Sequence, residues 1–333
     1  MAAGGPHVVI PARQAARYLP ACLAGAHRAG FAPGEITVVD DGSTDGTGGI
    51  ARAAGVAVVA GPRRGAAAAR NAGARAAGAA GAEILVFVDA DVVMGAGARK
   101  VIAEILAPGS GISAVFGAYD DRPGAPGAVS RFRNLLHRHV HLENAGPAGT
   151  FWTGLGAVRR GAFDAVGGFD PDQRMMEDVK FGMALARAGH AIRLDPRLQG
   201  THLKAWTLGS MARTDLLDRA IPWARLLLSE GAALPEGLNT APAARLSVVC
   251  AGLLVWALPV APLSPAGAAM LAGAACLVLA AANRAFLVRL RREAGAGLAL
   301  LAVPLLAVHY ACGGLGYAWA RVTSPRPAPD PDP

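Results

Sequence analysis

The sequence predicts a doubly wound α/β domain followed by membrane-spanning helices. In the N-terminal part, short apolar runs typical of strands alternate with helical stretches, which is the order of elements in an α/β fold. From about Arg245 the composition changes to long runs of Leu, Val and Ala, which are typical of membrane spans. We therefore expect the α/β domain over residues 1–235, the membrane region over residues 245–321, and a disordered, proline-rich tail over residues 322–333.

Mainly apolar runs of four or five residues mark the strands of the α/β domain. They predict strands over residues 7–11, 36–39, 56–59 and 84–88. A helical stretch from about Gln14 to Ala29 separates the first two strands, and an alanine-rich helix over residues 65–78 precedes the last one. The run over residues 84–88 has the composition of a central parallel strand.

Two carboxylates, Asp89 and Asp91, stand one residue apart directly after this last strand. Parallel sheets bind their ligands beyond the carboxyl ends of their strands. Two carboxylates at this spacing can present oxygens to a hard divalent cation, which in turn can hold the two phosphates of a nucleotide diphosphate. An isolated Asp-x-Asp also suits an ordinary acidic turn, so its context must decide between the two interpretations.

A second polar segment, residues 40–47, follows the strand over residues 36–39. Its glycines permit tight turns, and its Asp and Ser side chains suit turns and helix N-caps. A carboxylate just past a strand can accept hydrogen bonds from a uracil, guanine or ribose edge. A helix-capping loop is the alternative.

Several segments in this order resemble the family 2 glycosyltransferases of the GT-A fold, a Rossmann-like fold of nucleotide-diphospho-sugar transferases. The resemblance covers roughly residues 7–205, and its motifs are modest singly but specific in their order and spacing. The matching segments are residues 9–13, 38–47, 69–73, 88–91, Gly154, 160–170 and 176–182.

The resemblance implies a site for a nucleotide-diphosphate sugar and a divalent metal ion. Asp41 would contact the nucleotide base or ribose, and Asp91 would be the main ligand of Mn²⁺ or Mg²⁺, with Asp89 beside it. His202 would be a further metal ligand or a phosphate contact, although it can also be a polar residue in the passage toward the membrane. The implied nucleotide-sugar-binding residues are Pro11, Arg13, Asp40, Asp41, Ser43, Arg70, Asn71 and Asp89.

The family is expected to invert the anomeric centre in one displacement, which requires one general base. Asp178 matches this base, and Glu177 is its neighbour, in a pair that opens a helical stretch extending through Ala188. The helix dipole also favours a carboxylate at this place, and both interpretations can hold together.

The acceptor side is implied by the segment over residues 151–156, in which Trp152 would stack on a sugar or a lipid headgroup beside the turn at Gly154. Packing in the core is the alternative for Trp152. Gly168 would bring the acceptor wall and the base helix together. Trp206 would lie along the bilayer face and guide an amphiphilic acceptor, with a packed amphipathic surface helix as the alternative.

The Gln-x-x-Arg-Trp motif usual in processive polysaccharide synthases of this family does not occur, which favours transfer of a single sugar. The alternating residues His137, His139 and His141 suggest a metal cluster, but an acceptor-side or solvated position is the preferred interpretation. The glycine-rich N-terminal loop of nucleotidyltransferases is also missing, and this disfavours that related class.

Three apolar segments, residues 246–262, 266–282 and 296–320, predict membrane spans, with a buried hairpin of a soluble domain as the alternative. Four arginines lie between the second and third segments, whereas the loop around Ser264 has no charge. Positive residues remain inside, so the α/β domain is expected in the cytoplasm, bound to the inner membrane. Arg321 and Arg326 would then lie outside, which leaves a re-entrant third segment open. The four arginines are Arg284, Arg289, Arg291 and Arg292.

The formal net charge is +8, but the arginines are scattered and no nucleic-acid-binding signature organises them. We therefore expect anionic lipid and phosphate as partners, and no nucleic acid. No N-terminal signal peptide is visible. The sequence as a whole predicts a metal-dependent inverting glycosyltransferase that moves one sugar to a membrane-associated lipid acceptor. A processive synthase of the same fold and a nucleotidyltransferase are the alternatives.

Overall fold

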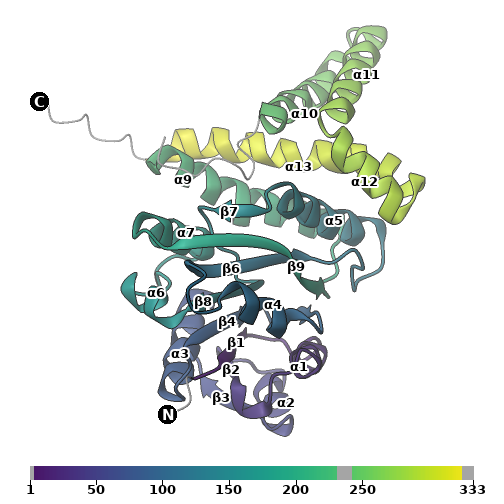
Figure 1. Cartoon of the computed structure of the whole chain (residues 1–333). Coiled ribbons are helices and arrows are strands. Elements are labelled where there is room, and N and C mark those ends of the chain that lie inside the picture. The colour runs from purple at the N-terminus through teal and green to yellow at the C-terminus, as the bar shows by residue number, and fades with distance from the viewer. Residues whose placement is uncertain (1–3, 231–241, 325–333) are drawn as a thin grey trace, which may run out of the picture. The chain divides into compact units, whose positions relative to one another are not determined.

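The computed structural model describes residues 4–230 and 242–324 (Figure 1). The chain divides into two compact units. The sheet unit comprises the residues up to Pro126 together with Asn134–Ala205, and the helical unit comprises Gly127–Arg133 together with the residues from Trp206 onward. The predicted extension of the α/β domain to residue 235 stays a prediction, and its last residues lie outside the described ranges.

The described part of the sheet unit contains a nine-stranded mixed sheet in the order β3-β2-β1-β4-β8-β6-β9-β5, with β7 paired to β9. The four strands predicted from sequence form its parallel half, in which β1 pairs with both β2 and β4. Beyond β4 the direction changes, because β8 is antiparallel to both β4 and β6. The strands are β1 (Pro6–Ala12), β2 (Ile36–Asp40), β3 (Ala57–Ala60), β4 (Ile84–Val88), β5 (Val92–Met94), β6 (Ile112–Tyr119), β7 (Gly146–Ala148), β8 (Leu155–Arg159) and β9 (Ala191–His202).

Helices cover both faces of this sheet, which explains why the central strand β4 is apolar at every position. Val8 and Ile10 of β1 pack on one face against α1, α2 and α4, whereas Val9 packs on the other face against α3, α6 and α7. The helices are α1 (Leu19–Arg28), α2 (Thr47–Ala53), α3 (Ala66–Ala79), α4 (Ala98–Ile105), α5 (Ala128–Glu143), α6 (Arg160–Ala165) and α7 (Glu177–Arg187), with the short 3₁₀ turn η1 (Pro33–Glu35). The fold class is the predicted one.

The first helix begins at Leu19 and not at the predicted Gln14. Gln14 has a φ of 52°, which is outside the helical region, and its backbone N–H donates to Ser43 Oγ at 3.0 Å. The next two backbone N–H groups are also bound by the loop after β2, through Thr47 and Asp45. The prediction was wrong because this segment hydrogen-bonds to a loop that is distant in sequence.

The helical unit contains three helices that are long and apolar enough to cross a membrane: α10 (Pro242–Val260), α11 (Pro265–Ala282) and α13 (Ala296–Thr323). Large apolar side chains are exposed along them, with Trp256 68% and Leu300 76% accessible, which suits contact with lipid. α13 extends two residues into the predicted tail, and the rest of that tail from residue 325 lies outside the described residues. The other elements of the unit are α8 (Leu208–Arg213), the π-helical turn η2 (Thr214–Ala220), α9 (Ile221–Glu230) and α12 (Arg284–Ala294).

Polar side chains connect the apolar helices to one another. Asn283, which follows α11, donates to Ser247 of α10 at 2.9 Å and accepts from Tyr310 of α13 at 2.9 Å. Such hydrogen bonds stabilise helix association where no hydrophobic driving force exists.

Candidate active site

A cavity of about 440 Å³ lies at the carboxyl ends of β1, β2 and β4 in the sheet unit. This is where a ligand is expected in an open α/β sheet. Lys204 also lines the cavity, although the sequence had not indicated it. The sequence-predicted residues that line it are Pro11, Arg13, Asp41, Arg70, Asp89 and Asp91.

Asp41 is buried at the cavity, where it orders the loop after β3. Its Oδ1 accepts the Arg63 backbone N–H at 2.6 Å, and its Oδ2 accepts that of Gly65 at 3.1 Å. Each carboxylate oxygen retains a second lone pair, so the group can still accept a hydrogen bond from a ligand.

Three predicted binding residues do not line the cavity. Asp40 Oδ1 accepts the backbone N–H of Ser43 at 2.9 Å, so these two residues shape the loop after β2. Asn71 forms two hydrogen bonds with the backbone of Phe169, at 2.6 and 3.0 Å. Gly168 has a φ of +76°, and a Cβ at this position would lie only 2.8 Å from Asn71 Oδ1. Asn71 and Gly168 therefore fix one turn together.

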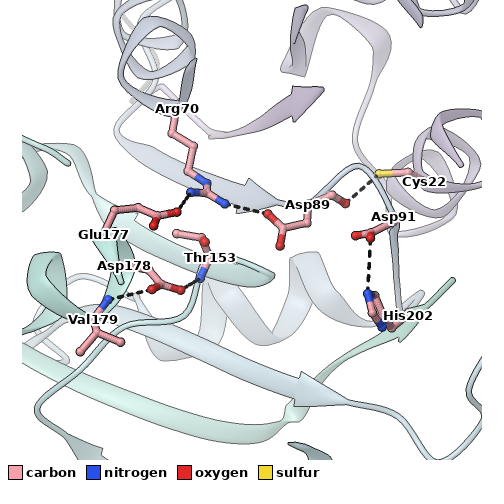
Figure 2. Close-up of polar contacts among 9 residues, drawn as sticks. All are labelled: Cys22, Arg70, Asp89, Asp91, Thr153, Glu177, Asp178, Val179 and His202. Atoms are coloured by element: carbon pink, nitrogen blue, oxygen red, sulfur yellow. Dashed lines mark hydrogen bonds and ion pairs between the residues drawn. The ribbon is translucent and has the colours of Figure 1, made fainter. Parts of the chain in front are cut away.

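Asp91 and His202 face each other across the pairing of β5 with β9. In this antiparallel pairing His202 is opposite Val92, and the backbone N–H of Leu203 donates to the Asp91 carbonyl at 2.8 Å. The register brings His202 Nε2 to 3.4 Å from Asp91 Oδ2 (Figure 2). His202 is thus the last residue of β9 in the sheet unit, rather than part of a passage toward the membrane.

A carboxylate oxygen and an imidazole nitrogen that face each other fit a divalent ion such as Mn²⁺ as two ligands. Among the described residues there is no group of three or more His, Cys, Asp or Glu side chains arranged for a metal. Any remaining ligands would have to come from a bound substrate or water. Asp89 is less suited to this role than Asp91, because its Oδ1 accepts from Arg70 Nη2 at 2.8 Å.

Arg70 is buried and joins the Asp89 loop to the start of α7. Besides Asp89, its guanidinium binds Glu177 Oε1 through Nη1 at 2.7 Å (Figure 2). Its Nε has no hydrogen-bond partner in the part of the chain that the structure describes. Arg70 therefore lines the cavity, as predicted, but its two terminal nitrogens are directed to carboxylates of the protein.

Asp178 is half-buried in the first turn of α7, beside this ion-paired group. Its Oδ1 accepts the Val179 backbone N–H at 2.8 Å, and its Oδ2 lies 3.5 Å from the backbone nitrogen of Thr153. Burial raises the pKa of Asp178 to about 7, the Glu177 carboxylate adds to the increase, and Arg70 opposes it. A carboxylate with a pKa near neutral pH is suited to accept a proton. Asp178 does not itself line the cavity.

Trp152 packs in an aromatic cluster of the sheet unit. Its ring centroid lies 5.0 Å from Tyr119, 4.9 Å from His137 and 5.1 Å from His141. A Cβ on Gly154 would lie 2.2 Å from the Trp152 ring, so the glycine is required for this packing. Trp152 is thus packed among aromatic side chains, as the core alternative expected. Two of the alternating histidines, His137 and His141, belong to the same cluster.

Trp206 belongs to the helical unit and is buried there. Its backbone N–H donates to Ser130 Oγ at 2.9 Å, and the Arg133 guanidinium lies 4.8 Å from its ring centroid. These contacts correspond to the packed alternative for Trp206 and not to an exposed position that guides an acceptor.

Sequence reasoning missed two side chains that support the site. Cys22 of α1 is buried, and its Sγ donates to the Asp89 carbonyl at 3.6 Å (Figure 2). Asn134 of α5 contacts His202, with 2.7 Å between Oδ1 and Nδ1. Neither contact has a local sequence signal, because each joins residues more than 60 positions apart.

The fold and this arrangement define a glycosyltransferase of the GT-A fold. Residues 7–167 match the family model Glycosyl transferase family 2, and the domain that they form belongs to this family. No curated protein matched the chain.

Several solved structures are similar to this chain at low sequence identity. The mannosyltransferase PcManGT from Pyrobaculum calidifontis, in complex with GDP-Man and Mn²⁺, has a TM-score of 0.54 and 19% identity, over 94% of this chain and 87% of that chain. TarS residues 1–349 from S. aureus has a TM-score of 0.47 and 16% identity, over 96% and 90%. Glucosyl-3-phosphoglycerate synthase from Mycobacterium tuberculosis has a TM-score of 0.47 and 21% identity, over 71% and 82%. The first of these similarities supports the GT-A fold.

Proposed function

We propose that this glycosyltransferase moves a single sugar, with inversion, from a nucleotide-diphosphate sugar to a membrane lipid at the cytoplasmic face. The observation that carries the proposal is the chain of contacts from Asp89 through Arg70 to Glu177. It joins the loop that carries Asp91 to the helix that carries Asp178. A cation-binding pair and a basic carboxylate are thus held in one unit.

The cavity is the proposed donor site. Asp41 would bind the nucleoside, while Arg13 and Lys204, which line the same cavity, provide positive charge for the diphosphate. Asp91 and His202 would hold Mn²⁺ or Mg²⁺. When bound, this ion neutralises the charge that develops on the departing nucleotide diphosphate. PcManGT, which was solved with GDP-Man and Mn²⁺, is consistent with this assignment.

Asp178 is the proposed general base. Its carboxylate takes the proton of the acceptor hydroxyl while the hydroxyl oxygen forms a bond to the anomeric carbon of the donor sugar. The bond from that carbon to the diphosphate breaks on the opposite side, and the electron pair leaves with the nucleotide diphosphate. One displacement inverts the anomeric centre.

The order of charges along the helical unit supports the proposed location. The α10–α11 connection contains no charged residue, whereas α12 exposes Arg284, Arg291 and Arg292. If α10 and α11 both cross the membrane, the positive-inside rule keeps α12 in the cytoplasm, together with everything that precedes α10. An active site anchored in this way meets a lipid acceptor at the membrane surface.

The test uses membranes that contain the protein, a panel of labelled nucleotide sugars and millimolar Mn²⁺. Label is expected in the lipid extract and is expected to be lost with Asp178→Asn or with a chelator. Asp164→Asn is the matched control, because Asp164 is an exposed carboxylate on α6. Label found only in a long water-soluble polymer would contradict single-sugar transfer. In a parallel assay with a nucleoside triphosphate and a sugar 1-phosphate, formation of a nucleotide sugar with release of pyrophosphate would indicate a nucleotidyltransferase.

A further inference from the structure

The imidazole of His202 is fixed by two neighbours of different kinds. The Tyr119 ring stacks on it, with 4.7 Å between centroids and 13° between planes. Asn134 of α5 meets its edge, with 2.7 Å between Oδ1 and Nδ1. Stacking sets the plane of the ring but does not distinguish its two nitrogens, whereas a hydrogen bond at the edge does.

The contact with Asn134 determines which nitrogen carries the proton. The structure places the amide oxygen of Asn134 against the ring, and because an amide oxygen only accepts hydrogen bonds, His202 Nδ1 is the donor in this arrangement. In the neutral ring Nε2 then presents a lone pair, and this is the atom that lies 3.4 Å from Asp91 Oδ2. Two electron-pair donors that face each other at this distance form an unfavourable pair unless a proton on Nε2 or a metal cation lies between them.

Packing alone does not explain why position 134 carries an asparagine. The residue is 1% exposed, and its Nδ2 has no hydrogen-bond partner within residues 4–230 and 242–324. A buried amide that uses only one of its two groups destabilises the fold relative to an apolar side chain of the same size. Among the described residues, His202 is the hydrogen-bond partner of this side chain.

We propose that Asn134 is a positioning residue, which holds His202 in the tautomer and orientation that direct Nε2 to a divalent cation shared with Asp91. The proposal rests on the metal role in the proposed function and adds a residue of α5 to it. Hydrogen bonds to the second nitrogen of a metal-binding histidine raise its basicity and fix its ring.

The experiment measures Mn²⁺ binding by electron paramagnetic resonance in the full chain, with GDP and UDP each present as a non-reactive partner. Asn134→Leu keeps the volume and removes the acceptor, so Mn²⁺ affinity is expected to fall about 10- to 100-fold. Asn134→Asp keeps an acceptor and is expected to stay within roughly threefold of the wild type. Asn144→Leu, near the end of the same helix, is the control that should leave the affinity unchanged.

A purely structural role of Asn134 predicts the opposite order of Mn²⁺ affinities for the two variants, because Leu suits a buried position and a new buried charge does not. Equal Mn²⁺ affinity of folded Asn134→Leu and wild type would therefore overturn the proposal. If the Leu variant does not fold, loss of affinity in folded Asn134→Asp would overturn it as well.

A spectroscopic readout separates this proposal from the proposed function. Bound Mn²⁺ is expected to show hyperfine coupling to a histidine nitrogen in the wild type, and this coupling should be lost in His202→Ala and reduced in Asn134→Leu. If the wild type binds no Mn²⁺ with either nucleotide, the metal role itself is wrong. If it binds with a coupling that Asn134→Leu leaves intact, only the role of Asn134 is wrong.

Discussion

Two carboxylates of the sheet unit, Asp91 and Asp178, have opposite electrostatic environments. Burial works to raise the pKa of Asp91, but His202 and the positive charge of Lys204 outweigh it and lower the pKa below the ordinary value. Burial also acts on Asp178, where the carboxylate of Glu177 reinforces it and the pKa rises to about 7. One group therefore stays ionised, whereas the other can take up a proton near neutral pH.

This difference shows how one fold can suit the same kind of side chain to the two roles proposed here. A carboxylate that stays charged suits a cation, and a carboxylate with a raised pKa suits proton transfer. Arg70 lies between the two carboxylates but does not give them the same pKa, because Asp89 and Glu177 already bind its terminal nitrogens.

Of the substitutions that test the difference between the two carboxylates, Asp178→Asn is expected to have the largest effect. The asparagine amide cannot take the proton of the acceptor hydroxyl, so kcat should fall about 10²- to 10⁴-fold. Donor binding should change little, because Asp178 does not line the cavity. Sugar transfer to lipid and donor affinity, measured on the same preparation, check both expectations. Loss of donor binding with unchanged kcat would contradict the role of a base.

Asp91→Asn addresses the other carboxylate and is expected to weaken Mn²⁺ binding by roughly one to two orders of magnitude, because a charged ligand is lost. The Mn²⁺ concentration that gives half-maximal transfer should rise accordingly. Asp121→Asn, an exposed carboxylate outside the site, is the control. An unchanged metal requirement would show that Asp91 is not a ligand.

The two sites also differ in their effect on stability. Because the pKa of Asp178 is raised above the ordinary value of 3.8 to about 7, the ionised form destabilises the fold. This cost is absent below the unfolded-state pKa, increases as the pH rises toward 7 and is complete above 7. Asp178→Asn should therefore stabilise the protein by roughly 2 to 4 kcal/mol at pH 8. Urea unfolding in detergent at pH 5 and pH 8 measures the gain, and an equal gain at both values would contradict it.

The smallest predicted effects are shifts of the acid limb of kcat/KM. Glu177 raises the pKa of Asp178, and Arg70 lowers it. Glu177→Gln should therefore move the acid limb to lower pH, and Arg70→Gln should move it to higher pH. Profiles of the two variants beside the wild type provide the measurement. Shifts in the same direction would exclude Asp178 as the group that titrates.

The sequence predicts the parallel half of the sheet well, because β1, β2, β3 and β4 are short, mainly apolar runs with clear boundaries. It also predicts the Asp89–Asp91 pair at the cavity, since the end of a buried strand fixes that position. The antiparallel half was not predicted, because β8 and β9 pair with strands distant in the chain.

The site was predicted less completely for the same reason. The role of Asn71 as a support for Gly168 and Phe169 depends on a contact across 98 positions, and the bond between Asn134 and His202 crosses 68 positions. Motifs identify residue types at the ends of elements. They do not specify which side chain from another element satisfies each polar atom.

The central claim is that the Asp91–His202 pair and Asp178 serve one reaction. The most direct measurement is an experimental structure with Mn²⁺ and a non-transferable nucleotide-diphosphate sugar. The account predicts that the nucleotide occupies the cavity near Asp41, that the ion contacts Asp91 and His202, and that the anomeric carbon faces Asp178 across the space for an acceptor hydroxyl. A donor sugar directed away from Asp178, or an ion bound elsewhere, would contradict it.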